Sequence, residues 1–389
     1  MTNIATPRLI PEWAPQCATM LVWPHQDTDW GNNPGSKSNN KSNALQPNKA
    51  QSSSLLEDIN NTYVDLTHTI CRYQPALIIC KDTHHKKNIH HQLNNSTPAK
   101  MGPKHPVIFV IAPYNDTWCR DSGPLSVYRD DTAVPEVELL DFRFNGWGNK
   151  YESGLDDLLC HHLSQAGLLN DPMIPIDFGL EGGSIDGNGD GLLLTTKSCL
   201  LSNTRNKGLN QSDIEMQLTN YLGCKKILWL SEGKLFGDDT DSHIDNLARF
   251  VNPTTIVYAN CVTQGDVHYM PLLAMEKELH QLNNSNNLGF DLVPIPIPEP
   301  IFDCDTGSRL PGSYINFMLV NNAVIVPTFD VPEDSLALKI YASLFPTRDI
   351  QSITGNHLIR QFGGPHCASM QLPRGVLNIA HTTSIKEST

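Results

Sequence analysis

The feature that most constrains this 389-residue chain is a regular alternation that begins at Val107. Apolar stretches of strand length alternate with loops that carry charged residues and glycine, and several are separated by segments whose apolar residues recur at helical spacing. This alternation is typical of an α/β protein with many short units. No proline- and glycine-rich linker divides it, so we expect a single domain over residues 1–389. The alternation alone also permits an open α/β sheet.

The elements follow from this pattern. We predict strands at Thr19–Trp23, Ala76–Cys80, Val107–Ile111, Leu125–Tyr128, Val137–Phe142, Gly191–Thr195, Lys226–Leu230, Ala248–Val251, Thr255–Ala259, Asp291–Ile297, Tyr314–Val320 and Ala323–Pro327. We predict helices at Leu55–Tyr73, Leu155–Ala166, Gln211–Leu222, Pro271–Leu282 and Ser335–Phe345.

The composition is that of a globular protein, with 39% hydrophobic and 18% charged residues. The longest apolar runs, Val107–Pro113 and Ala323–Pro327, are too short to cross a membrane. The N-terminal stretch MTNIATPRLIPEW lacks the basic and apolar regions of a secretory signal, so we expect a cytoplasmic protein with no membrane partner.

The net charge of −13 argues against a nucleic-acid partner, whose binding site would be a basic surface. A negative charge suits a cationic substrate, although solubility alone explains it as well. Residues 31–54 form a polar tract rich in Asn, Ser and Lys that cannot bury enough apolar surface to order itself. We interpret this tract as a flexible surface insertion.

Two features bear on metal binding. Ten cysteines without a repeated spacing or a CxxC pair indicate reduced thiols and favour neither a disulfide framework nor a zinc site. His84, His85, His90 and His91 lie in a polar, lysine-bearing segment without an accompanying carboxylate or cysteine ligand. We interpret them as a solvated surface, and we expect no metal.

One cysteine stands apart from the others. In the stretch RQFGGPHCASMQLPR, Cys367 follows a Gly-Gly-Pro turn and a histidine. Gly363 and Gly364 allow close approach of a ligand, and Pro365 fixes the exit from the turn. Such a turn can present a thiol to a pocket, although a buried structural cysteine would give the same local pattern.

Three loops after predicted strands carry further polar residues. WCRDSGP contains Asp121, and EGGS places Glu181 before two glycines. In DDTDSHIDNLAR, His243 and Asp245 are two residues apart and would share one side of an extended segment. A salt-bridged turn, a hairpin and a packed polar patch would explain these loops individually.

Together these loops indicate covalent catalysis by a thiol. A thiolate attacks an electrophilic carbon while a histidine transfers protons. Neighbouring carboxylates raise the pKa of a thiol, so they suit such a site only if the substrate is a cation that neutralises them. A guanidinium fits this description, because its N–H groups bind carboxylates bidentately and its central carbon is electrophilic.

Several stretches occur in the order found in one enzyme family: IPEWAPQCATMLVWPH, NDTWCRDSGP, FNGWGNKY, LEGGSIDGNGDGLLLTTKSCLLSNTRN, DDTDSHIDNLARF, LPGSYINFMLVNNAVIVPTFDVPEDSLAL and GGPHCASMQLP. From Pro11 to Pro373 the chain resembles the agmatine deiminase family, which includes bacterial peptidyl-arginine deiminase-like enzymes. The resemblance implies a five-bladed α/β propeller, the pentein fold, with pseudo-fivefold ββαβ units over about residues 8–380. The family more often has a third glycine or an aliphatic residue at the position of Pro365.

The family pattern implies roles for individual residues. Cys367 would be the nucleophile and His243 the general acid and base. Asp121 and Asp245 would bind the guanidinium nitrogens, and Glu181 would hold His243 or share the charge of the substrate.

Two further residues would contribute to substrate binding, Trp118 by packing the methylene chain and Gly364 by allowing close approach. The implied reaction releases ammonia from agmatine through a covalent thiouronium and yields N-carbamoylputrescine, a step of polyamine (putrescine) biosynthesis. It needs no metal or organic cofactor.

The residues leave alternatives open. The same chemistry could act on peptidyl-arginine, free arginine or a methylated arginine, and an α-carboxylate would then require an arginine such as Arg120, Arg249 or Arg309. A papain-like hydrolase would carry a CGSCW-type signature, which this sequence lacks. A non-catalytic binding protein on the same fold would not need the Cys, His and Asp set. The oligomeric state, a homo-oligomer included, stays open.

Overall fold

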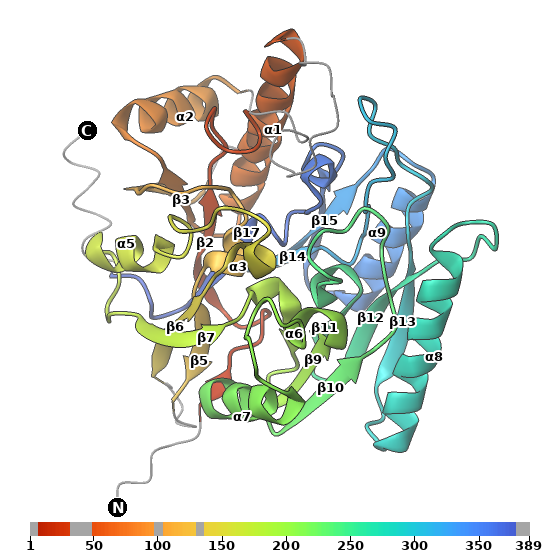
Figure 1. The fold of residues 1–389 in the computed structure, drawn as a ribbon. Helices are drawn as coiled ribbons and strands as arrows, with labels where there is room; N and C mark the ends of the chain where they lie inside the picture. Colours follow the sequence, from red (N-terminus) through yellow and green to blue (C-terminus); the bar gives the residue numbers. More distant parts are fainter. Residues whose placement is uncertain (1–6, 32–48, 97–103, 130–135, 379–389) are drawn as a thin grey trace, which may run out of the picture.

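The computed structural model describes residues 7–31, 49–96, 104–129 and 136–378, in which strands and helices alternate along the chain. Their strands form five separate sheets of three or four strands each. The long helices lie around the outside of the molecule, and the short helix α3 (Cys119–Ser122) lies near its centre (Figure 1). The chain is therefore an α/β protein, as the sequence predicted.

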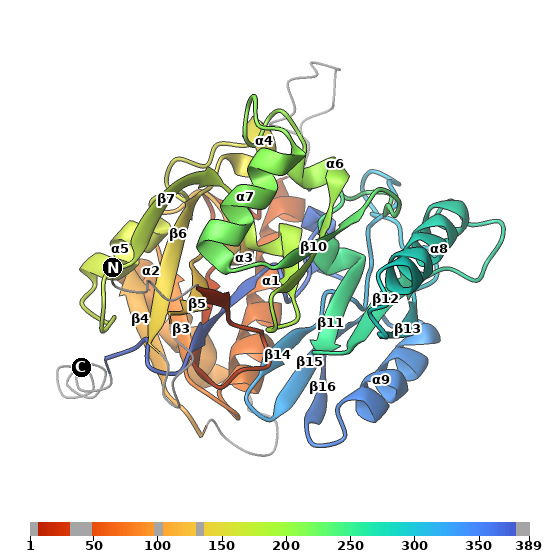
Figure 2. The same ribbon diagram turned by 90° about the horizontal axis from the view of Figure 1, so that it is seen from below.

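Each sheet repeats one plan, in which two antiparallel strands are followed by a helix and a parallel strand. In one example β11 (Ala248–Asn252) pairs antiparallel with β12 (Thr255–Asn260). The helix α8 (Tyr269–Ser285) then leads to β13 (Asp291–Pro296), which pairs in parallel with β12. Parallel strands need such a crossover, and α8 covers the sheet that it connects (Figure 2).

Three further sheets follow the same plan. The first contains β8 (Ile185–Gly187), β9 (Leu192–Thr196), α7 (Gln211–Leu222) and β10 (Lys226–Leu230). The second contains β14 (Met318–Val320), β15 (Ala323–Thr328), α9 (Glu333–Leu344) and β16 (Asp349–Thr354). The third contains β5 (Leu125–Tyr128), β6 (Val137–Arg143), α5 (Leu159–Gln165) and β7 (Ile174–Gly179), with β1 (Arg8–Leu9) as an edge strand.

The remaining sheet joins segments from the two ends of the described chain. Its elements are β17 (Ser369–Pro373), β2 (Gln16–Val22), α1 (Lys49–Ile70), β3 (Ala76–Cys80), α2 (Thr83–Asn95) and β4 (Val107–Ile111). β17 pairs antiparallel with β2, so that Ser369 lies opposite Leu21. This pairing anchors the loop of Cys367 to the first long strand.

Local sequence signals explain individual elements. α7 begins at a capping box, in which Asn210 and Asp213 bind each other's backbone N–H groups, and it ends at Gly223 with a φ of 66°. β15 is a continuous apolar run because both of its faces are covered, and Ala323 and Val326 are both 0% exposed. The core lies between the sheets and the outer helices.

Most predicted elements are confirmed, and five have the predicted bounds: β3, β4, β5, β10 and α7. The elements that were not predicted are the strands β1, β7, β8, β16 and β17, the helix α2 and the four-residue helices α3, α4 (Gly146–Asn149) and α6 (Lys197–Leu200). β16 reads DIQSIT and alternates only weakly, and Pro175 lies inside β7. Such strands form because their neighbours supply the pairing partners.

Two expectations are corrected. The predicted strand Tyr314–Val320 is limited to β14, and Tyr314 belongs to the preceding turn. Of the tract at residues 31–54, residues 32–48 lie outside the described residues, whereas 49–54 belong to the helix α1. The histidine-rich segment forms the helix α2, capped by Asp82, and His84, His90 and His91 are exposed, as expected of a solvated surface.

Candidate active site

Chemically active side chains converge around Gly183. A Cβ atom at Gly183 would lie 2.8 Å from Nδ1 of His243, 2.9 Å from Oδ1 of Asp121 and 3.0 Å from Oδ2 of Asp245. Any side chain there would collide with all three, so this position needs glycine. Gly183 therefore marks the point at which three of the predicted site residues meet.

Short segments between the strands carry these residues. Asp121 lies in α3, and Glu181 immediately precedes the 3₁₀ turn η1 (Gly182–Ser184). The expectation that His243 and Asp245 share one side of an extended segment is wrong, because the chain turns into the 3₁₀ helix η2 (Ile244–Asn246) directly after His243. Both side chains nevertheless reach the same site.

Cys367 lies beside this cluster and is 4% exposed. Its Sγ is 3.3 Å from Oδ2 of Asp245 and 3.0 Å from Nδ2 of Asn316. Burial raises the pKa of the Cys367 thiol well above its ordinary value, the charges of Asp245 and Asp121 raise it further, and the hydrogen bond from Asn316 lowers it. At neutral pH the free protein therefore holds a thiol that donates to Asp245.

His243 is fully buried, and its two ring nitrogens face different groups. Nε2 lies 3.1 Å from Oε2 of Glu181, and Nδ1 lies 3.7 Å from Oδ1 of Asp121. Burial alone would lower the pKa of His243, but the charge of Asp121, together with Cys199 and Glu181, raises it well above its ordinary value. The surrounding acids therefore favour the imidazolium form of the ring.

Glu181 is held from its other side by Arg205. The Nε atom of Arg205 lies 3.1 and 3.2 Å from the two carboxylate oxygens, and its Nη2 atom donates to the carbonyl of Thr240, three residues before His243. Burial opposes ionisation of Glu181, but the hydrogen bond and charge of His243 and the charge of Arg205 bring its pKa below the ordinary value. Arg205 thus fixes both the carboxylate and the loop of His243.

Glu181, Cys199 and His243 each offer one ligand atom, and these atoms lie within 4.8 Å of one another. Within the described part of the chain, no other group of such residues has a spacing that a metal ion could use. The guanidinium of Arg205 already occupies both oxygens of Glu181, and Cys199 donates to one of them over 3.5 Å. The three side chains therefore form a hydrogen-bonded support for His243.

Asp121 is oriented by two donors. The indole Nε1 of Trp147 donates to Oδ2 over 2.9 Å, and the backbone N–H of Gly183 donates to Oδ1 over 2.9 Å. Burial raises the pKa of Asp121, the charge of His243 opposes this rise, and the charges of Asp245 and Glu181 add to it. A cation bound at this carboxylate would relieve the repulsion.

Asp245 has one satisfied and one unsatisfied oxygen. Oδ2 lies 2.8 Å from Nδ1 of His366 and 3.2 Å from Nδ2 of Asn316. Burial alone would raise the pKa of Asp245, but His366 above all, with His243 and Arg249, brings it below the ordinary value. Oδ1 is buried without a hydrogen-bond partner among the described residues, as is Nδ1 of His243. Buried polar atoms of this kind indicate where a polar ligand would bind.

The two predicted substrate-binding residues lie at the cysteine loop. Trp118 is 7% exposed, and a Cβ atom at Gly363 would lie 2.2 Å from its ring. A Cβ atom at Gly364 would lie 2.4 Å from Oδ1 of Asn316. The two glycines of the turn therefore make room for a tryptophan and an asparagine.

Sequence reasoning missed the residues that hold the predicted ones. Four residues contact the predicted site residues from positions that are distant in sequence: Trp147, Arg205, Asn316 and His366. The sequence held one signal for Trp147, which lies between two glycines in FNGWGNKY. In the structure its φ is 54°, a conformation that is uncommon for residues other than glycine. His366 lies directly before Cys367 in the stretch already singled out, whereas Arg205 and Asn316 stand in ordinary sequence contexts.

The three arginines that the sequence left open are engaged in other interactions. Arg120 donates to the carbonyl of His366 and pairs with Glu12, and Arg249 pairs with Asp186 and Glu12. Arg309 pairs with Asp266, over 3.2 Å. These contacts give none of the three a role in binding an α-carboxylate.

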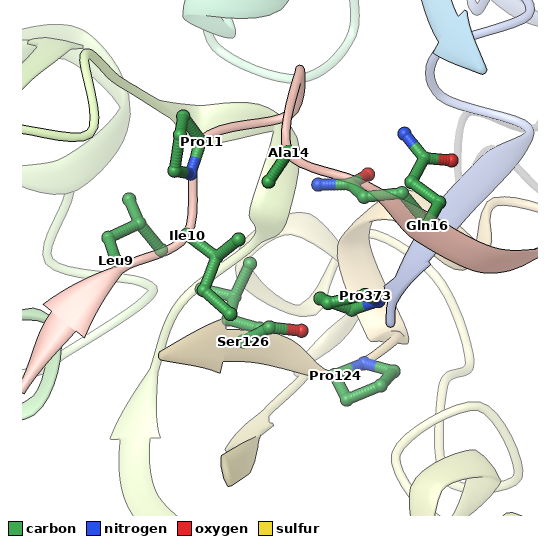
Figure 3. Close-up of a pocket in the computed structure, with 10 residues that line it drawn as sticks. Leu9, Ile10, Pro11, Ala14, Gln16, Pro124, Ser126 and Pro373 are labelled. Carbon is green, nitrogen blue, oxygen red and sulfur yellow. The ribbon is translucent and has the colours of Figure 1, made fainter. Parts of the chain in front are cut away.

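A pocket of the molecule lies apart from this cluster. It is lined mainly by apolar residues near β1, β5 and β17, including Pro11, Pro124 and Pro373 (Figure 3). None of its lining residues is an acid, a histidine or a cysteine. This pocket therefore offers neither a nucleophile nor a general acid or base.

The arrangement suits a planar cation with several N–H groups. Two buried carboxylates, Asp121 and Asp245, lie next to a thiol and an imidazolium. The carboxylates can bind the N–H groups, the thiol can attack the carbon between them, and the imidazolium can protonate a leaving group.

Comparisons with known proteins show similarity over nearly the whole chain. Residues 8–373 match the family described as Porphyromonas-type peptidyl-arginine deiminase. A protein of Pseudomonas aeruginosa (strain LESB58), named agmatine deiminase, is 31% identical over 392 residues, which cover 94% of this chain and 95% of that protein.

Solved structures give the same result. An agmatine deiminase of C. jejuni with substrate bound has a TM-score of 0.81 and 32% identity, covering 96% of this chain and 98% of that one. A structure described as a putative peptidyl-arginine deiminase has a TM-score of 0.81 and 35% identity, covering 96% of this chain and 100% of that one. Among the described residues, no helix is long and apolar enough to cross a membrane.

Proposed function

The chain belongs to the Porphyromonas-type peptidyl-arginine deiminase family, and we propose that it hydrolyses the guanidinium group of agmatine to N-carbamoylputrescine and ammonia. The relatives at 30 to 31% identity are named agmatine deiminases, and they match over nearly their whole length. The substrate-bound relative of C. jejuni supports a small guanidine as the ligand.

One observation carries this proposal. The buried carboxylates of Asp121 and Asp245 and the thiol of Cys367 lie together, and Oδ1 of Asp245 has no partner among the described residues. Without a bound ligand this arrangement is unfavourable for a thiol nucleophile, since the negative charges of the two carboxylates raise the pKa of Cys367. A bound guanidinium removes this cost, because it neutralises the carboxylates and donates to the free oxygen.

The first half of the reaction forms a covalent intermediate. The positive charge of the bound substrate lowers the pKa of the Cys367 thiol, which releases its proton to solvent. The thiolate adds to the guanidinium carbon, and Nδ1 of His243 protonates the departing nitrogen. The C–N bond breaks, ammonia leaves, and a thiouronium remains on Cys367.

The second half regenerates the enzyme. His243, now neutral, accepts a proton from water, and the resulting hydroxide adds to the thiouronium carbon. The C–S bond then breaks, the ureido product leaves, and its excess proton returns to the sulfur. Glu181 keeps the ring of His243 oriented through Nε2, so that Nδ1 faces the substrate in both halves.

Agmatine is favoured over arginine by the engagement of Arg120, Arg249 and Arg309. Agmatine has no α-carboxylate, so a pocket that binds it needs no arginine for that group. Trp118 lies against the cysteine loop, which supports the proposal that it packs the methylene chain. Free arginine and peptidyl-arginine remain the alternatives, with the same chemistry.

The five sheets support a five-bladed α/β propeller with pseudo-fivefold symmetry, in which each sheet is one blade. Each blade has the antiparallel pair and parallel crossover described above. The site residues come from the segments between the blades, which agrees with a single catalytic domain. Each proposed step uses side chains of this chain and water.

Ammonia release by the purified protein from agmatine, free arginine and an arginine-containing peptide tests the proposal, with Cys367→Ser alongside. We expect turnover of agmatine, abolished in the variant. Turnover of arginine or the peptide in place of agmatine would retain the chemistry and overturn the substrate. No turnover of all three would favour a non-catalytic binding protein.

A further inference from the structure

One carboxylate that the reaction described above does not use contacts the segments of both proposed substrate-binding acids and of the thiol. Glu12 lies between β1 and β2, and its side chain is 20% exposed. Its two oxygens contact three basic side chains, those of Arg120, Arg249 and His366. Each of these side chains belongs to a segment that carries a residue of the proposed site.

Arg120 connects Glu12 to Asp121 and to the cysteine loop. Its Nη1 atom lies 3.2 Å from Oε1 of Glu12, and Arg120 directly precedes Asp121 in the chain. Its backbone N–H donates to the carbonyl of Cys367 over 3.2 Å, and its Nε donates to the carbonyl of His366 over 3.3 Å. Arg120 therefore joins the segment of Asp121 to the loop of the thiol, and Glu12 holds the side chain that makes this connection.

The ring of His366 contacts a carboxylate through each of its nitrogens. Nε2 lies 2.7 Å from Oε1 of Glu12, and Nδ1 lies 2.8 Å from Oδ2 of Asp245. Burial alone would raise the pKa of Glu12, but the charges of its three basic partners bring it well below the ordinary value. An ionised carboxylate only accepts hydrogen bonds, so both ring nitrogens have to donate. Glu12 thus holds the ring in the form that donates to Asp245.

Arg249 connects Glu12 to Asp245 along the chain. It is fully buried in β11, which follows the turn of Asp245, and its Nη2 atom donates to Oε2 of Glu12. Its Nε atom lies 3.1 Å from Oδ2 of Asp186, and its Nη1 atom lies 3.2 Å from the carbonyl of Ile315. Arg249 is therefore held at both ends of its guanidinium, and Glu12 is one of the two anions that hold it.

We propose that Glu12 is a positioning residue, which sets the relative positions of the two substrate carboxylates and the nucleophilic thiol by binding one basic side chain in the segment of each. The inference rests on the proposed function, in which Asp121, Asp245 and Cys367 act on one guanidinium. The guanidinium has to bind both carboxylates while its carbon faces the sulfur, so small displacements among the three groups have large effects.

A second buried carboxylate allows stability and positioning to be separated. Asp186 is 6% exposed, binds Arg249, and accepts from a backbone N–H of β11 over 2.9 Å. Its hydrogen bonds within the described part of the chain reach neither Arg120 nor His366. A substitution at Asp186 therefore disturbs the same buried arginine but leaves the connections to Asp121 and to the cysteine loop in place.

Agmatine turnover by Glu12→Gln tests the inference, with Asp186→Asn as the matched control. Glutamine keeps the length of the side chain but has a single acceptor oxygen, so it cannot bind all three basic groups. We expect KM for agmatine to rise about tenfold or more and kcat to fall, because the carboxylates and the thiol lose their relative positions. Asp186→Asn should lower the free energy of unfolding and leave KM within about twofold of that of the unchanged protein.

The value of KM separates positioning from a general loss of structure. Unfolded protein lowers the apparent kcat, whereas the KM of the folded remainder stays the same. An unchanged KM in Glu12→Gln, or an equal rise in Asp186→Asn, overturns the inference. If Glu12→Gln does not fold, Glu12→Asp carries the test, because it keeps the charge on a shorter side chain. KM should again rise, and an unchanged KM overturns the inference.

The unchanged protein, measured in the same assay, shows whether the proposed function holds. If it turns over arginine or the peptide in place of agmatine, the same comparison is made with that substrate, since all three carry a guanidinium. If it turns over none of them, the proposed function fails and the role of Glu12 fails with it. Turnover by the unchanged protein without a rise of KM in Glu12→Gln overturns the role of Glu12 alone.

Discussion

Nδ1 of His366 lies 2.8 Å from Oδ2 of Asp245, so the residue directly before the nucleophile binds one of the two carboxylates proposed to bind the substrate. The other ring nitrogen lies 2.7 Å from Oε1 of Glu12. The ring thus joins the cysteine loop to the N-terminal segment. Because the hydrogen bond of His366 lowers the pKa of Asp245, it keeps that residue ionised and its free oxygen directed to the ligand.

Replacement of His366 by Ala should therefore weaken substrate binding. A hydrogen bond to a charged group contributes about 1.5–3 kcal/mol, so we expect kcat/KM for agmatine to fall about 10- to 100-fold, mainly through KM. His268→Gln is a matched control, since His268 is also a buried histidine 2.9 Å from an aspartate, Asp266, outside the site. A loss confined to kcat, or an equal loss in the control, would contradict this role.

Removal of Arg205 should destabilise the fold more than removal of one partner of a more exposed ion pair would. The side chains of Arg205 and Glu181 are 1% and 2% exposed, so Arg205→Ala leaves a buried carboxylate that has lost one of its two cationic partners, with His243 as the other. We expect the free energy of unfolding to fall by about 3–5 kcal/mol in chemical denaturation. Arg129→Ala breaks a half-buried pair with Glu138, whose side chains are 29% and 27% exposed, and should cost about 0–1 kcal/mol. Similar losses in the two variants would refute the expectation.

A methyl group at Gly183 should close the site. In Gly183→Ala the new Cβ would fall within 3.0 Å of His243, Asp121 and Asp245, so these side chains must move apart. We expect kcat/KM to fall by more than about 100-fold, because a displacement of about 1 Å in an active site has an effect of that size. Gly265→Ala is the control, since no atom lies within 4 Å of its added Cβ. Retained activity in Gly183→Ala would show that substrate binds elsewhere.

The pH profile should report the proton of His243. Its pKa is raised above the ordinary value of 6.5, so the imidazolium is present below the raised pKa and is lost as the pH increases through it. We expect an alkaline limb of kcat/KM above pH 6.5. Glu181→Gln removes one of the groups that raise this pKa, so the limb should move to lower pH. Glu138→Gln, at a half-buried strand position away from the site, should leave it in place. A limb that does not move in Glu181→Gln would argue against His243 as the acid.

The sequence was sufficient to place Cys367, His243, Asp121, Asp245 and Glu181 in candidate loops. It was sufficient because each stands beside glycines or other polar residues, in a pattern shared by a family. Their partners could not be found in the same way. Arg205 reaches Glu181 across 24 positions and Asn316 reaches Cys367 across 51, and such contacts exist only after the sheets have formed.

The secondary structure also differs between elements with local sequence signals and elements that depend on distant partners. α7 was predicted with its final bounds because its capping box and terminal glycine are local signals. β16 and β17 were missed because their residues adopt strand structure through pairing with β15 and β2. The helix α2 was missed because its histidines and asparagines give no clear apolar face, and Ile89 is its buried residue.

The pairing of β17 with β2 has a consequence for folding during synthesis of the protein. During synthesis β2 leaves the ribosome early, but its antiparallel partner follows only after almost all of the described chain has been made. Until then β2 has an uncovered edge, and the turn that carries Cys367 has no strand to anchor it. The loop of Cys367 therefore cannot take its final position in the nascent chain. Pairing of β17 with β2 joins segments that are far apart in sequence, and such contacts are the slowest to form.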